Sequence, residues 1–128
     1  MGSKQMDVSR TDNQELAIRE RLAEIGLDDD NEAMTEVVEQ FRLAIRSHTD
    51  AVTEAIASAD LVAVAHAAHK LSGTAVTLGA DDLGRLASHV EADAANRRTA
   101  TLEVQTGPLA AEAERAIAAA GSILASIS

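Results

Sequence analysis

His69 stands in a setting that suits nucleophilic chemistry at a protein surface. It lies in the run AHKLSG at residues 68–73, so that a glycine, Gly73, follows it four positions later. Residues four apart are neighbours on a helix surface, and a glycine there would leave the imidazole open to a bulky partner. A neutral imidazole is a nucleophile near pH 7 and can accept a phosphoryl group. The pattern predicts a histidine presented to another protein.

The helix that carries this histidine is predicted over Leu61–Leu78, with Gly79 as its left-handed end. At about 100° per residue, six of its apolar residues fall within an arc of roughly 100°, which we assign to the core. That arc contains Leu61, Val64, Ala68, Leu71, Ala75 and Leu78. His69 and Gly73 lie outside it. A glycine inside a helix costs about 1 kcal/mol relative to alanine, so an outward Gly73 indicates a compensating functional reason.

Apolar residues outside the core arc flank His69 and predict a modest docking surface. They are Val62, Ala65 and Val76. His66, one turn before His69, is interpreted as part of this surface, with its phosphorylation in place of His69 as the alternative.

Composition narrows the classes of partner. The chain has 128 residues, no cysteine and a formal net charge of -10, and Phe41 is its single aromatic residue. Without clustered cations or a stacking platform, nucleic acid is not expected as a partner. Disulfides and thiolate metal sites are excluded. No apolar run is long enough to span a bilayer and no signal-peptide pattern is present, so we expect a cytoplasmic protein with no membrane partner.

The remaining elements are also predicted to be helices, because the chain is rich in alanine and has one proline. A short leading helix is expected from a cap at Thr11 or Asp12 to a stop at Gly26. Residues 1–10 are interpreted as a disordered segment or a cloning remnant, and residues 11–128 as one helical-bundle domain.

Three further helices complete the predicted fold. One is capped within residues 28–31 and ends near residues 59–60, and His48 on its apolar stripe is expected to be buried or half-buried. Another is capped by Asp81 or Asp82. The last opens at Gly107-Pro108, as a cap followed by proline at the first helical position. Amphipathic helices with short connections predict an all-α, antiparallel four-helix bundle with a short additional N-terminal helix.

At these residues the sequence resembles the histidine-containing phosphotransfer (HPt) domains of two-component phosphorelays. The matching positions are Ala68, His69, Leu71, Gly73, Leu78, Gly79, Ala80, Leu83, Leu86 and Glu91. The resemblance extends to the helix layout over about residues 12–126.

The resemblance implies a phosphoryl shuttle. His69 would accept a phosphoryl group from the aspartate of one receiver domain and pass it to the aspartate of another. The receiver would hold the Mg²⁺, so this chain would carry no cofactor and act as a phosphoryl carrier more than an autonomous enzyme. Receiver domains, with a hybrid histidine kinase as a further candidate, are the implied partners, and a monomer is expected.

One departure from the family pattern concerns the charge near the histidine. Many members carry lysine three residues after it, where this chain has Ser72, which offers a hydrogen bond and no charge. Lys70 lies about 100° round the helix from His69 and is a weak substitute. With Gly73, these two residues form the predicted supporting set, and the lifetime of the phosphohistidine depends on them.

Two other function classes are consistent with the sequence. A helical adaptor that binds a receiver or kinase without being phosphorylated would use the same face. A metal protein is the other hypothesis, since His66 and His69 at i, i+3 could chelate one ion. The Glu-x-x-His pairs of di-iron bundles are absent from this chain.

Overall fold

Helices account for the regular structure of the chain. The computed structural model describes residues 2–27 and 29–127, and side chains from residue 13 onward. Within this part of the chain there is no strand, and the helices are α1 (Gly2–Glu24), α2 (Asn31–Ala57), α3 (Leu61–Leu78), α4 (Asp81–Ala95) and α5 (Thr99–Ile127). The predicted all-α class is confirmed. None of the described helices is long and apolar enough to cross a membrane.

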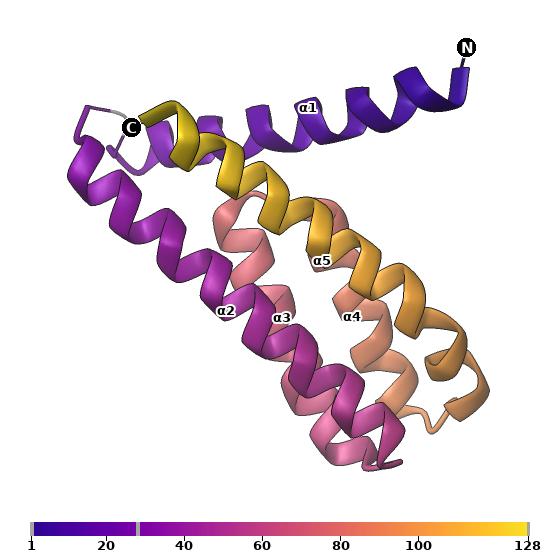
Figure 1. The fold of residues 1–128 in the computed structure, drawn as a ribbon. Helices are drawn as coiled ribbons and strands as arrows, with labels where there is room; N and C mark the ends of the chain where they lie inside the picture. Colours follow the sequence, from indigo (N-terminus) through magenta and orange to yellow (C-terminus); the bar gives the residue numbers. More distant parts are fainter. Residues whose placement is uncertain (1, 28, 128) are drawn as a thin grey trace.

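Helices α2 to α5 lie alongside one another and share one core (Figure 1). α2 contacts α3 and α5, and α4 contacts the same two helices. The spacing of apolar residues explains this packing, because Val38, Ile45 and Val52 recur every second turn of α2 and all are fully buried. α1 lies across the end of these helices at which α2 begins and α5 ends, and it contacts α5 and α3 (Figure 1).

Side-chain and glycine caps define the ends of the helix that carries His69. The Asp60 carboxylate accepts a hydrogen bond from the Ala63 N–H at 3.1 Å. At the other end Gly79 adopts the left-handed conformation (φ 97°), which glycine enters without steric cost. α2 begins similarly, with Asp30 accepting from the Ala33 N–H at 3.0 Å. The predicted Gly79 end and the α2 cap within residues 28–31 are confirmed.

The predicted cap of α4 is wrong. Neither Asp81 nor Asp82 precedes the helix; both lie in its first turn, and Ala80 is the capping residue without a side-chain hydrogen bond. The Ala80 N–H instead bonds to the Ala75 carbonyl at 2.8 Å. This contact belongs to the turn that ends α3, so α4 starts at the next residue, where the two carboxylates face the positive end of its dipole.

The predicted start of the last helix is also wrong. α5 begins at Thr99 and continues through Pro108. The turns before the proline are held by packing, because Leu102 is fully buried. Proline inside a helix costs about 3 kcal/mol, and burial of Leu102 contributes a comparable stabilisation of about 1.5–3 kcal/mol. The segment around Pro108 is exposed, so the carbonyl that loses its donor can bond water.

α1 begins at Gly2, ahead of the predicted cap at Thr11 or Asp12. The side chains of residues 1–12 lie outside the described ones. The interpretation of residues 1–10 and the domain limits 11–128 stay predictions.

Candidate functional site

α3 turns His69 away from the core. Ala68 and Leu71, on either side of it, are fully buried, whereas the His69 side chain is 77% exposed. The apolar arc read from the sequence is the buried face of the helix, with Leu61 half-buried at its edge. A reacting group could therefore approach the imidazole from solvent.

Glu91 of α4 contacts one nitrogen of this imidazole. His69 Nδ1 lies 3.1 Å from Oε2 and 3.3 Å from Oε1 of the half-buried Glu91 carboxylate. An ionised carboxylate only accepts hydrogen bonds, so it favours the tautomer in which Nδ1 carries the proton. In that tautomer Nε2 bears the lone pair. The sequence analysis named Glu91 only as a position of the family motif and did not predict its contact with His69. The two residues are 22 positions apart, and helical periodicity relates only residues within a few turns of one helix.

Ser72 is bonded to α4. Its hydroxyl donates to the Gly84 carbonyl at 3.2 Å and shares a hydrogen bond with the Ser88 hydroxyl at 2.8 Å. These contacts place the Ser72 side chain in the seam between α3 and α4, less than one turn from His69. Ser88 was missed in the sequence, since a serine on an exposed helix face carries no distinctive signal.

Two glycines on adjacent helices play different parts near the site. A Cβ at Gly73 would meet nothing within 4 Å, so this residue borders open space. A Cβ at Gly84 would lie 2.7 Å from Val76 Cγ2, so this glycine permits the close approach of α4 to α3. Gly84 was not singled out in the sequence, because one glycine in a helix does not reveal what packs against it.

The charge of Lys70 on α3 acts on a histidine of α2. Burial and, after it, the positive charge of Lys70 lower the pKa of the half-buried His48 on that helix. The ammonium group is thus close enough to His48 to affect its titration. The expected half-buried position of His48 is confirmed.

Exposed apolar side chains lie on α3 before and after His69. Val62 is 83% exposed and Val76 is 46% exposed. Ala65 is half-buried and His66 is exposed. The four residues predicted for docking therefore all reach the surface of α3 to some extent, along the helix face that carries His69.

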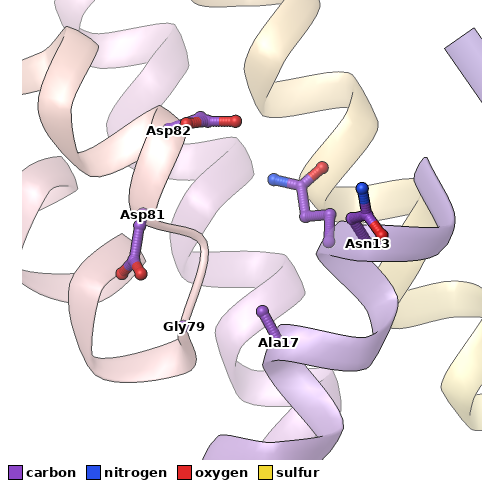
Figure 2. Close-up of a pocket in the computed structure, with 6 residues that line it drawn as sticks. Asn13, Ala17, Gly79, Asp81 and Asp82 are labelled. Atoms are coloured by element: carbon purple, nitrogen blue, oxygen red, sulfur yellow. The ribbon is translucent and has the colours of Figure 1, made fainter. Parts of the chain in front are cut away.

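A pocket lies elsewhere, between α1 and the turn that joins α3 to α4 (Figure 2). Asp82 projects toward Asn13 across it, whereas Asp81 points away. Its lining residues are Asn13, Gln14, Ala17, Gly79, Asp81 and Asp82. His69 and Glu91 are not among them. Within the described residues, no group of three or more histidine, aspartate or glutamate side chains could hold a metal ion.

Comparison with known proteins assigns the chain to a family. The family model described as "Hpt domain" matches residues 36–122, which is more than half of the chain. The matched region runs from the first turns of α2 into the last turns of α5 and includes the site on α3 and α4. No match was found among curated proteins or among solved structures.

Proposed function

Because the chain belongs to the Hpt domain family, we propose that it is a histidine phosphotransfer protein of a two-component phosphorelay. In this proposal His69 accepts a phosphoryl group from the aspartate of one receiver domain and passes it to the aspartate of another. The observation that carries it is the exposed imidazole whose Nδ1 faces the Glu91 carboxylate. That contact supports Nε2 as the nucleophile.

The proposed transfer uses one lone pair and no proton from solvent. Nε2 attacks the phosphorus of the aspartyl phosphate, and the N–P bond forms as the P–O bond to the aspartate breaks. The aspartate leaves as a carboxylate. The ring then carries a positive charge. The Glu91 carboxylate balances this charge and accepts a hydrogen bond from Nδ1–H, which keeps its proton. The return transfer to a second aspartate reverses each of these changes.

The chain contributes few charges to stabilise the transferring group. Its phosphoryl oxygens carry negative charge, whereas Ser72 offers only a hydroxyl that already bonds Gly84 and Ser88. After burial, the charge of Lys70 lowers the pKa of His48 on α2. We propose that Mg²⁺ bound by the receiver supplies the charge neutralisation. The protein then acts as a carrier of the phosphoryl group more than as an autonomous enzyme.

The proposed docking face surrounds His69 on α3. It comprises Val62, Ala65, His66, Gly73 and Val76, whose exposure leaves them available to a partner. We further propose that α2 to α5 form the antiparallel four-helix bundle expected from the sequence. A cytoplasmic monomer that binds receiver domains, with neither nucleic acid nor membrane as a partner, completes the proposal.

The test is phosphoryl transfer from a panel of phosphorylated receiver domains in Mg²⁺, followed by intact-mass analysis. We expect a gain of one phosphoryl group that is acid-labile and alkali-stable, and that His69→Gln abolishes. His89→Gln, at an exposed position on α4 outside the proposed docking face, is the matched control and should keep the gain. Binding of a receiver without any transfer would contradict the shuttle and favour the non-phosphorylated adaptor.

A further inference from the structure

A shallow hollow lies at the end of the α3–α4 surface nearest the start of α3. It is lined by Leu61, Val62, Ala65, Ala94, Ala95 and Arg97. Five of these six residues are apolar, and Arg97 supplies the only charge in the lining. Val62 is 83% exposed, so water covers much of its side chain in the free protein. An aliphatic side chain of a partner would displace that water favourably.

The hollow is continuous with the proposed phosphotransfer site. Ala65 precedes His69 by four residues on α3, and Ala95 follows Glu91 by four residues on α4. One helical turn rises about 5.4 Å. A typical protein interface covers about 800 Å² of each partner, which corresponds to a disc of about 16 Å radius. A receiver centred on His69 therefore covers the hollow as well.

Arg97 is unusual among the arginines of this acidic chain. Of those whose side chains are described, each of the others pairs with a carboxylate: Arg19, Arg21, Arg42, Arg46, Arg85, Arg98 and Arg115. Within the same part of the chain Arg97 has no such partner, although the net charge is -10. Its neighbour Arg98 pairs with Asp93 at 3.0 Å. The guanidinium of Arg97 is thus available to a carboxylate from outside.

Resting on the proposed function, we infer that this hollow and Arg97 select the receiver that docks on His69. The fitting receiver presents an aliphatic side chain with a carboxylate beside it. The aliphatic group fills the space between Val62, Ala65 and Ala95, and the carboxylate pairs with Arg97. Charge at the rim of an interface sets partner choice more than total affinity, so Arg97 is a specificity-determining residue.

Two substitutions test the inference without disturbing the core. Arg97 has a left-handed backbone (φ 58°), which asparagine tolerates well, so Arg97→Asn removes the charge at no cost in backbone strain. Val62→Glu places a carboxylate in the hollow at an exposed position. Arg46→Glu is the control for a change of charge, because Arg46 lies on α2 and pairs with Glu114 of α5.

The readouts separate docking from chemistry. Transfer from the phosphorylated receivers that load the wild-type protein is measured against receiver concentration, and phosphoramidate serves as a small phosphoryl donor that needs no docking. We expect the KM for receiver to rise about threefold for Arg97→Asn and about tenfold for Val62→Glu. The maximal rate, the phosphoramidate reaction and the Arg46→Glu control should change by less than twofold.

Two results would overturn the inference. An unchanged KM for both variants, with normal phosphoramidate loading of His69, would show that the receiver docks elsewhere while the proposed function stands. If phosphoramidate loads His69 but no receiver transfers a phosphoryl group to it, the proposed function is contradicted, and so is the inference that rests on it.

Discussion

At the scale of single residues, the contact between His69 and Glu91 connects the two helices of the site. The carboxylate lies against Nδ1 at 3.1 Å, and the imidazole remains 77% exposed. A neighbour on α3 itself would have to come from positions three or four away, which are His66 and Gly73 among others. The carboxylate that contacts the His69 imidazole therefore comes from the next helix.

We predict that Glu91→Ala lowers the rate of phosphoryl transfer about tenfold, because it removes a hydrogen bond to a ring that becomes charged. Glu91→Gln should retain part of the rate, since its amide oxygen still accepts from Nδ1. Single-turnover transfer measures the loss, and the imidazole ¹⁵N chemical shifts report which nitrogen carries the proton. Glu103→Ala on α5 is the control. An unchanged tautomer and rate in Glu91→Ala would refute the orienting role.

Ser72 gives a second prediction at this scale. Ser72→Lys adds a cation one turn from His69, and we expect the half-life of the phosphohistidine to lengthen about threefold. The protein is loaded with phosphoramidate, freed of the donor and followed by mass spectrometry. Ser72→Gln, which is polar but uncharged, should show no such gain. Equal half-lives for the lysine and glutamine variants would mean that charge at this position does not act on the phosphoryl group.

At the scale of elements, the distance between α3 and α4 depends on which of the two nearby glycines faces the neighbouring helix. Gly73 faces open space, whereas a Cβ at Gly84 would meet Val76 at 2.7 Å. Replacing glycine by alanine should therefore affect stability differently at the two positions. Helix propensity alone favours alanine over glycine by about 1 kcal/mol at each position.

We predict that Gly73→Ala raises the free energy of unfolding by about 1 kcal/mol, and that Gly84→Ala gains nothing because Val76 must move. Urea unfolding of both variants measures the difference. In a Val76→Ala background the obstructing methyl is gone, and Gly84→Ala should then stabilise the protein. A gain from Gly84→Ala that is the same in both backgrounds would exclude the steric explanation.

The lowered pKa of His48 on α2 predicts that the stability of the protein depends on pH. Burial, then Lys70, lowers the pKa of His48 in the folded protein. The unfolded chain therefore binds the proton more tightly, and stability present above about pH 6.5 is lost as pH falls through the folded-state pKa.

We expect His48→Gln to weaken this loss of stability between pH 7.5 and pH 5.5, measured as the change in free energy of unfolding. His89→Gln, at an exposed position on α4, should leave the loss as it is in the wild type. The same pH dependence in His48→Gln and wild type would assign it to other groups.

At the scale of the whole molecule, an acidic chain presents one face with exposed apolar residues around a histidine. The docking face proposed on α3 would be hidden if two copies associated through it. We predict a monomer of 13.3 kDa in sedimentation equilibrium from 10 to 300 µM, with His69 still reactive toward phosphoramidate. A dimer whose mass reverts to that of the monomer in Val62→Glu would place the self-association on this face.

Much of the fold follows from interactions between residues close in sequence. The apolar arc of α3, its Gly79 end and the outward direction of His69 depend on neighbours within one turn, so a single sequence reveals them. The same local rules misplaced the start of α5. Gly107-Pro108 is a good start signal, but the burial of Leu102 keeps the helix continuous from Thr99.

The sequence by itself determined an all-helical protein in which a surface histidine, His69, lies beside a glycine. Only the tertiary structure decided which side chains meet that histidine. Glu91 reaches Nδ1 of His69, Ser72 shares a hydrogen bond with Ser88, and, after burial, the charge of Lys70 lowers the pKa of His48. Each of these relations joins two helices, and it depends on how far each helix is rotated and how closely it approaches its neighbour. Helical periodicity gives the faces of a helix, whereas packing at residues such as Gly84 and Val76 sets its distance from the next one.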